Sequence, residues 1–188
     1  MLRVLVIAAV LAGCHPKLSA GYDATAHVRG PLANLQSIPR VAALTGVEGT
    51  APAPEGRTIN AGLSFGDKIF QIGIGMRANN IAKSTLDPLN GPQYVSAAAS
   101  LDFRYTWVRI KNFSTNLVLA PTRTLLVDSA SANYTWGSGI RYGAGLLVRL
   151  HAFGIYADAY QEKIVFSDGP AFGNSTRTGL SIGLAFQP

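Results

Sequence analysis

Residues 135–150 read TWGSGIRYGAGLLVRL, and this stretch decides the fold. Apolar side chains dominate its even positions, from Trp136 to Leu150, whereas its odd positions are mostly glycine with Arg141 and Arg149. A two-residue period places alternate side chains on opposite faces of a β-strand. Strands in globular proteins usually run about 5–6 residues. The alternation therefore predicts an unusually long strand with one apolar face.

The composition of the whole chain favours a membrane environment. Its 188 residues include only 14% charged and 48% hydrophobic residues, and the mean hydropathy is +0.21. No run, however, approaches the roughly 20 apolar residues of a spanning helix. Hydrophobicity must instead be distributed by alternation along strands. Because lipid allows only helices and closed barrels to span it, the sequence predicts a single barrel domain.

The charge and cysteine content exclude several classes of function. The net charge of +6 could indicate a nucleic-acid partner, but the 16 Lys and Arg residues form no block, so no nucleic acid is expected. Cys14 is the single cysteine, which excludes an intramolecular disulfide and a thiolate zinc site. No His, Cys, Asp and Glu cluster has metal-ligand spacing, so neither a metal nor a cofactor is expected.

The same alternation recurs along the rest of the chain. It predicts strands at residues 19–29, 58–66, 68–77, 93–107, 113–127, 135–150, 153–166 and 177–186. Alternation in the first of these is weak, so the count is eight if that strand is real. Pro121 lacks a ladder donor, and we expect a bulge or break there. The in/out phase beyond it, including the orientation of Arg123, stays open.

The connections between these strands alternate in length. Those near residues 67, 110 and 151 are tight, whereas those at 30–57, 79–92, 128–133 and 167–176 are mostly longer. Short periplasmic turns and longer external loops are typical of outer-membrane barrels with an even strand number. The sequence predicts an all-β, antiparallel up-and-down transmembrane β-barrel with both termini on the periplasmic side.

The polar face is predicted to point into the barrel. It carries ten glycines between Gly62 and Gly183, where a solvated sheet would favour Thr, Lys and Glu. An eight-stranded barrel has an interior only just wide enough for side chains, so a pore is not expected. Unpaired buried charges are costly. We therefore predict an interior ion-pair network of Arg77, Asp102, Arg104, Arg141, Arg149, Asp158, Glu162 and Arg177, with Asp23, His27 and Arg29 also inward.

Within that network, Asp102, Asp158 or Glu162 are the expected partners of Arg141 and Arg149. Four aromatic residues are predicted near the strand ends, where they resemble the interfacial girdles of membrane barrels. They are Tyr105, Trp107 and Phe186 near the turns and Trp136 near the loops.

The N-terminus carries the parts of an export signal. Arg3 precedes a short apolar core at residues 4–10, and small residues lead to Cys14. Leu11-Ala12-Gly13-Cys14 resembles the lipobox of bacterial outer-membrane lipoproteins. The resemblance implies cleavage after Gly13 and a lipid on Cys14; an ordinary export signal with a fortuitous cysteine is the alternative. The expected organisation is a signal peptide at 1–13, a lipid-anchored N-terminus at 14–18 and a barrel at 19–187.

In whole-chain pattern, residues 19–187 resemble the small OmpA-type barrels of Gram-negative outer membranes. We expect a non-enzymatic structural or partner-binding component of the cell envelope, with no catalytic residues. Its partners would be outer-membrane lipid and other envelope proteins, contacted through the external loops. The candidate docking residues, which could equally fold over the barrel mouth, are Leu32, Leu35, Ile38, Val41 and Leu44.

Two alternatives remain open at this point. One is a lipid A-modifying hydrolase or acyltransferase, by similarity to small barrel enzymes that use a Ser/His pair, with His27 or His151 as the candidate base. The other is a soluble, lipid-anchored periplasmic β-barrel that binds an apolar ligand. The sequence does not indicate a particular ligand or an oligomeric state.

Overall fold

The computed structural model describes residues 16–32, 37–38, 51–52, 58–83, 93–128, 131–169 and 171–187. Within these ranges, eight long strands close into a barrel in the order β1-β10-β9-β8-β7-β6-β5-β4. A separate small sheet is formed by β2 (Ser37–Ile38) and β3 (Ala51–Pro52). The barrel strands are β1 (Lys17–Arg29), β4 (Thr58–Gly66), β5 (Phe70–Lys83), β6 (Gln93–Ile110), β7 (Phe113–Asp128), β8 (Tyr134–Leu150), β9 (Phe153–Phe166) and β10 (Gly173–Phe186).

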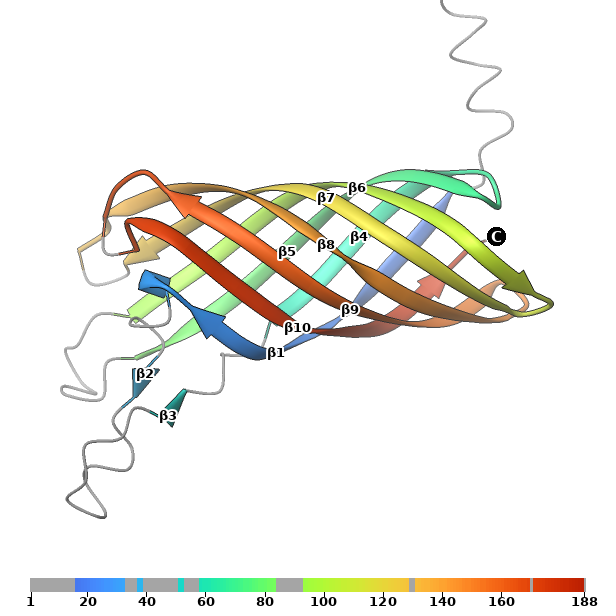
Figure 1. Cartoon of the computed structure of the whole chain (residues 1–188), viewed down its shortest axis with the longest axis horizontal. Coiled ribbons are helices and arrows are strands. Elements are labelled where there is room, and N and C mark those ends of the chain that lie inside the picture. The colour runs from blue at the N-terminus through green and yellow to red at the C-terminus, as the bar shows by residue number, and fades with distance from the viewer. Residues whose placement is uncertain are drawn as a thin grey trace, which may run out of the picture.

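Each barrel strand pairs antiparallel with the strands on either side of it, and β1 closes the ring between β10 and β4. The strands run obliquely around the long axis (Figure 1). Local alternation favours long strands, and ring closure leaves no unpaired strand edge. The predicted all-β, antiparallel up-and-down barrel is therefore confirmed, and the weakly alternating first strand belongs to it.

The two ends of the barrel differ. At one end, which we call the turn end, residues 67–69, 111–112 and 151–152 make tight turns, and β10 finishes there close to the start of β1 (Figure 1). Backbone hydrogen bonds tie this end together: the amide of Gln187 donates to the carbonyl of Ala152 at 2.8 Å, and that of Arg149 to Asn112 at 2.7 Å. The opposite end carries the longer connections, and we call it the loop end.

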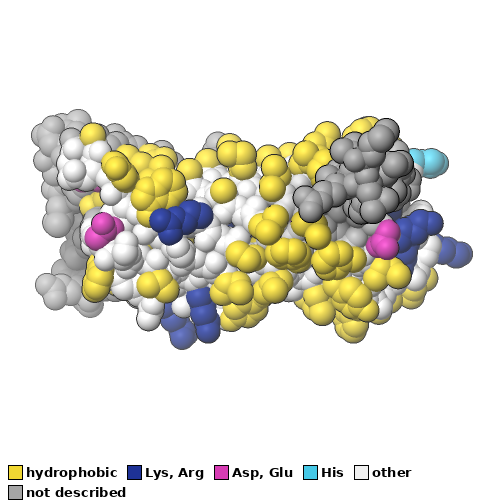
Figure 2. Space-filling view, turned by 90° about the horizontal axis from the view of Figure 1, so that it is seen from above, with side chains coloured by type: hydrophobic (Ala, Val, Ile, Leu, Met, Phe, Trp, Pro, Cys, Tyr) yellow, Lys and Arg dark blue, Asp and Glu magenta, His cyan; other side chains and the backbone are white. Residues whose placement is uncertain are grey.

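Side-chain direction follows the alternation. Along β5, Ile72, Ile74 and Met76 are 43%, 58% and 67% exposed on the outside of the barrel, whereas Arg77 lies buried inside. Hydrophobic side chains cover much of the outer wall in Figure 2. Apolar side chains outside and charges inside are the inverse of a soluble domain and suit a bilayer. The described residues form no helix that is long and apolar enough to cross a membrane.

The first strand differs in detail from the prediction. It begins at Lys17, so Lys17 and Leu18 belong to the barrel and not to an anchor segment. Thr25 and His27 pair with the adjacent residues Gly179 and Thr178 of β10, which leaves Ala26 as an extra, bulged residue. A bulge inverts the in/out phase beyond it. His27 and Arg29 are consequently exposed outside the barrel, and the expectation that they point inward is wrong.

Of the bulge or break predicted at Pro121, the structure has no bulge, and the break is confined to the pairing with β6. β7 is continuous, and its register against β8 is unbroken from Ala120 through Thr122. On the other side, the β6–β7 pairing omits the two residue pairs around Pro121 and resumes without a shift. Pro121 itself is exposed outside the barrel. The N–H group that proline lacks thus falls in a short gap of the β6–β7 ladder. The in/out alternation of β7 continues unchanged past Pro121, so Arg123 points outward.

Candidate functional site

The interior of the barrel is crossed by a two-pronged ion pair between Arg77 and Glu162. The two guanidinium nitrogens of Arg77 donate to the two carboxylate oxygens of Glu162 at 2.9 and 2.7 Å. β5 and β9 have three strands between them on either side, so this contact spans the full width of the lumen. Glu162 is 0% exposed. A fork-to-fork geometry is the strongest form of such a pair.

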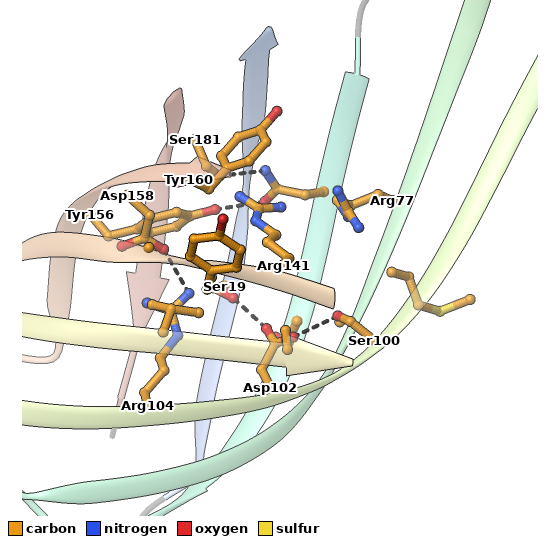
Figure 3. Close-up of a pocket in the computed structure, with 18 of the residues that line it drawn as sticks. Ser19, Arg77, Ser100, Asp102, Arg104, Arg141, Tyr156, Asp158, Tyr160 and Ser181 are labelled. Carbon is orange, nitrogen blue, oxygen red and sulfur yellow. Dashed lines mark hydrogen bonds and ion pairs between the residues drawn. The ribbon is translucent and has the colours of Figure 1, made fainter. Parts of the chain in front are cut away.

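Two further ion pairs span the lumen beside it. Arg104 on β6 contacts Asp158 on β9 at 2.7 Å, and Arg141 on β8 contacts Asp23 on β1 at 3.2 Å. The guanidinium of Arg141 also lies 3.8 Å from the centroid of the Tyr160 ring, which adds a cation–π contact. Figure 3 shows Arg104, Asp158, Arg141 and Tyr160 converging from several strands.

Asn60 extends the Arg141–Asp23 pair into a network of polar side chains. Its amide nitrogen donates to Asp23 at 2.6 Å and to Ser181 at 3.0 Å. Its amide oxygen accepts the hydroxyl of Tyr156 at 2.6 Å. Nearby, Ser100 donates to Asp102 at 2.6 Å (Figure 3). Buried polar groups that satisfy one another in this way make a rigid interior.

The glycines of the inner face make room for this network. A methyl group at Gly145 would lie 1.8 Å from the Oδ1 atom of Asp158, and one at Gly183 would lie 2.7 Å from the Tyr156 ring. Glycine is the residue that permits such close approach. The glycine-rich alternation of residues 135–150 is thus complementary to the long inward side chains of β9.

Little open volume remains inside the barrel. The cavity lined by the network has a volume of about 50 Å³, which is room for a few waters at most. At the loop end, Leu32 is 0% exposed and packs with four buried residues; together they form the loop-end cluster of Leu32, Leu126, Ile164, Phe166 and Ala171. The amide of Leu32 donates to Ser175 at 3.0 Å. Side chains therefore close the described interior at its middle and at this end.

The predicted interior residues fall into three groups. Arg77, Arg104, Arg141, Asp158 and Glu162 form the ion pairs, with Asp23 as the partner of Arg141. Asp102 and Arg177 are also inside; Asp102 accepts from Ser100, and Arg177 acts electrostatically on Glu162. Arg149 is half-buried at the turn end and forms no ion pair with a described carboxylate, contrary to expectation.

The predicted docking residues are not all on the surface. Leu32 is buried in the loop-end cluster, so it is not part of an exposed docking surface. Ile38 lies in β2, and Leu35, Val41 and Leu44 lie outside the described residues, as does Cys14.

Of the predicted aromatic girdle, Tyr105, Trp107 and Trp136 are exposed outside the barrel. Phe186 is half-buried against Phe153, with 5.1 Å between ring centroids. The guanidinium of Arg123 lies 5.3 Å from the centroid of the Trp136 ring and donates to Ser138. An outward arginine is thus held against an aromatic ring.

Sequence reasoning missed several interior residues. Asn60, Tyr156 and Tyr160 lie on the polar parity of their strands, so the alternation contained the signal for them. Leu126, Ile164 and Phe166 face inward although they are apolar. Ile164 and Phe166 continue the inward parity of Tyr156 and Tyr160, but their apolar character gives no sign of a place inside the barrel. The loop-end cluster follows only from the folded barrel.

The described residues show no assembled catalytic or metal site. No group of three His, Cys, Asp or Glu side chains among them could hold a metal ion. His27 and His151 form no hydrogen bond with a described residue, so nothing in the described chain orients either imidazole as a general base.

Comparison with known proteins gives structural matches alone. No family model matches the sequence, and the curated proteins include none that matches it. The fold is similar to the crystal structure of Neisserial surface protein A, with TM-score 0.54, 12% identity, and 94% of this chain and 97% of that chain covered.

Two other solved structures are similar over the same extent. A major outer membrane protein from Thermus thermophilus gives TM-score 0.57 at 9% identity, covering 93% of this chain and 99% of that one. Ail, the attachment invasion locus protein of Yersinia pestis, in complex with the heparin analogue sucrose octasulfate, gives 0.56 at 13% identity, covering 93% and 99%. At such low identity, these matches establish the eight-stranded barrel fold of this chain and nothing further about it.

Proposed function

We propose that this protein is a barrel of the outer membrane, with its turn end toward the periplasm and its loop end toward the outside. The apolar outer wall supports insertion in a bilayer. Short turns at one end and longer connections at the other support the orientation. Two of the similar solved structures are of a surface protein and an outer membrane protein.

Its role is structural or partner-binding and not enzymatic, and lipid A is not its substrate. The observation that carries this proposal is the closed interior, in which three ion pairs cross the lumen and leave a cavity of about 50 Å³. A barrel of this kind neither conducts nor encloses a ligand, so its function resides on its surface. The polar interior likewise argues against a soluble barrel that binds an apolar ligand.

The external connection after Leu32 is the proposed interaction surface, and another envelope protein is the proposed partner. Leu32 anchors the start of this connection inside the barrel. The residues available for docking are then Leu35, Ile38, Val41 and Leu44. Because Leu32 fixes the first residue of the connection at the barrel mouth, the connection would lose less conformational entropy when it binds a partner.

The test is a variant in which residues 39–50 are replaced by a short Gly/Ser linker. We expect it to insert and to keep the heat-modifiable gel mobility of a folded barrel, while cross-linking to envelope proteins through a photoreactive residue at Leu35 is lost. A photoreactive residue at Ile74, on the lipid-facing wall, is the control for non-specific capture.

Three results would overturn the proposal. They are failure of the 39–50 variant to insert, stable single-channel conductance of the wild-type protein in planar bilayers, and a change in lipid A mass on overexpression. The last result would favour the lipid-modifying alternative, and its dependence on His27 would be checked with His27→Ala.

A further inference from the structure

A basic pocket of about 200 Å³ opens at the turn end of the barrel. Its titratable lining residues are Lys17, Lys68, Arg149 and His151, and no Asp or Glu of the described chain lines it. Lys and Arg side chains gather at this end of the molecule, on the right in Figure 2. The pocket is separate from the ion-paired interior described above.

Lys17 is the most deeply placed of these cations. It is the first residue of β1, pairs in the ladder with Ser64, and is only 5% exposed. It forms neither a hydrogen bond nor an ion pair with a described residue. Transfer of an ammonium group out of water is costly unless an acceptor replaces the lost hydration. Lys17 therefore brings to the pocket a cation that has no described acceptor.

Arg149 adds a second cation without a counter-charge among the described residues. It is half-buried in the wall of the same pocket and lies close enough to Arg109 to experience its charge. Like charges brought together at a barrel mouth repel one another. An anion bound between Lys17 and Arg149 would relieve both the desolvation and the repulsion.

The nearest carboxylates are already engaged. Asp158 and Asp102 act electrostatically on Lys17, but Arg104 and Arg149 oppose them. Asp158 is paired with Arg104 at 2.7 Å, and Asp102 accepts from Ser100. Asp67, on the neighbouring turn, accepts from the amides of Ile69 and Phe70. None of the three neutralises the pocket.

The pocket also offers an acceptor. The side-chain oxygen Oε1 of Gln187 is buried there and has no hydrogen-bond partner in the described part of the chain. An anion that also carries a hydroxyl or N–H donor would satisfy this oxygen together with the cations. Phosphate groups fit this description, because they combine several acceptor oxygens with a donor on the phosphate or on its ester.

We propose that this pocket binds a phosphate group, presented either by a phospholipid head group of the inner leaflet or by a soluble phosphate ester. Lys17 and Arg149 hold the phosphate oxygens, Lys68 and His151 line the entrance, and Gln187 accepts from the donor. That the phosphate comes from the periplasmic side of the membrane rests on the orientation proposed above. The site itself depends only on the geometry of the pocket.

The experiment uses the full-length protein in a non-ionic detergent, titrated with inorganic phosphate in calorimetry. We expect saturable binding, weakened about tenfold or more by Lys17→Met or Arg149→Gln because each removes a charge-assisted hydrogen bond. Lys111→Met, an exposed turn-end cation outside the pocket lining, is the matched control and should bind like wild type.

A competition experiment distinguishes a lipid head group from a soluble phosphate ester as the ligand. Nanodiscs containing phosphatidylglycerol, but not those of phosphatidylcholine alone, should compete with inorganic phosphate if the ligand is a lipid head group. Binding of inorganic phosphate without such competition would assign the site to a soluble ester.

Two outcomes would overturn the proposal: no saturable phosphate binding by the wild-type protein, or equal affinity in the Lys17→Met and Arg149→Gln variants. Heat-modifiable mobility checks that these variants fold. The double variant Lys68→Ala/His151→Ala removes two exposed side chains at the entrance of the pocket, and it can be tested even if Lys17→Met misfolds. A phosphate affinity equal to that of the wild type in this double variant would also count against the site. A failed outer-loop experiment leaves these results unaffected, so the two proposals fail separately.

Discussion

Arg77 and Glu162 stand on opposite walls of the barrel and meet across its axis through two hydrogen bonds of 2.9 and 2.7 Å. Their strands are separated by three others in either direction around the ring. A contact of this kind fastens the two halves of the wall to each other and occupies the centre of the lumen. The stability of the barrel should accordingly depend on this pair more than on any charge of the outer surface.

Substitution Glu162→Gln should lower the free energy of unfolding by about 3–5 kcal/mol, because it leaves a buried arginine without its carboxylate. Arg77→Met should cost less, since Glu162 also experiences the charges of Arg177 and Arg141. Urea unfolding in micelles, followed by tryptophan fluorescence, measures both. Lys163→Met, the next and outward residue of β9, is the control and should change stability by no more than about 0.5 kcal/mol. A larger effect of Arg77→Met than of Glu162→Gln would contradict this account.

Gly145→Ala should destabilise the barrel by about 1–3 kcal/mol through overpacking. The added methyl group would lie 1.8 Å from the Oδ1 atom of Asp158 and would push that carboxylate away from Arg104. Gly62→Ala is the milder control, because its methyl group would meet the rotatable hydroxyl of Ser19 at 2.9 Å. Equal unfolding midpoints for the two variants would show that the glycine face is not shaped by the side chains it faces.

The bulge at Ala26 makes a prediction about thiol accessibility. In a Cys14→Ser background, His27→Cys and Arg29→Cys should react with a maleimide reagent, whereas Val28→Cys, which points toward the loop-end cluster, should be protected. Deletion of Ala26 removes the extra residue and should leave this pattern unchanged. Were β1 regular in the native protein, the deletion would invert the pattern.

These differences show what the sequence could and could not predict. Alternation is a local property, so it placed the strands and identified most of the inward charges, including Arg77, Arg104, Arg141, Asp158 and Glu162. The pairing of those charges depends on how far the strands are staggered around the ring, which no single strand records. Arg141 therefore pairs with Asp23, and Arg149 is left at the turn end without a described carboxylate partner.

The differences at Ala26 and Pro121 also arise from the pairing between neighbouring strands. Ala26 is extra only in relation to its partners on β10, and Pro121 is tolerated because its missing donor falls in a gap of the β6 ladder. Neither fact is visible in the strand that contains the residue. The loop-end cluster likewise joins Leu32 to residues more than ninety positions away, so the contacts among its apolar members could not be predicted from any one strand.

Stability at acid pH should depend on Asp67 in the first turn. The amides of Phe70 and Ile69 donate to its carboxylate and hold its pKa below the ordinary value of 3.8. A lowered folded-state pKa contributes stability that is present above the unfolded value and is lost as the pH falls through the folded one. Asp67→Asn should remove this pH dependence from unfolding midpoints measured between about pH 5 and pH 2. Asp168→Asn, which removes another exposed carboxylate, is the control, and an identical loss of pH dependence there would contradict the role of Asp67.

Cys14 should carry a lipid, because Leu11-Ala12-Gly13-Cys14 resembles a lipobox and precedes Lys17, the first residue of β1, by only three positions. Mass spectrometry of the mature protein should then give an N-terminus at Cys14 with an added diacylglyceryl group and acyl chain. Cys14→Ser should abolish the modification, and with the barrel wall intact the protein should still be found in the outer membrane. An unmodified mature N-terminus at another residue would refute lipidation. Release of Cys14→Ser into the aqueous phase would show that the lipid, and not the apolar wall, holds the protein in the membrane.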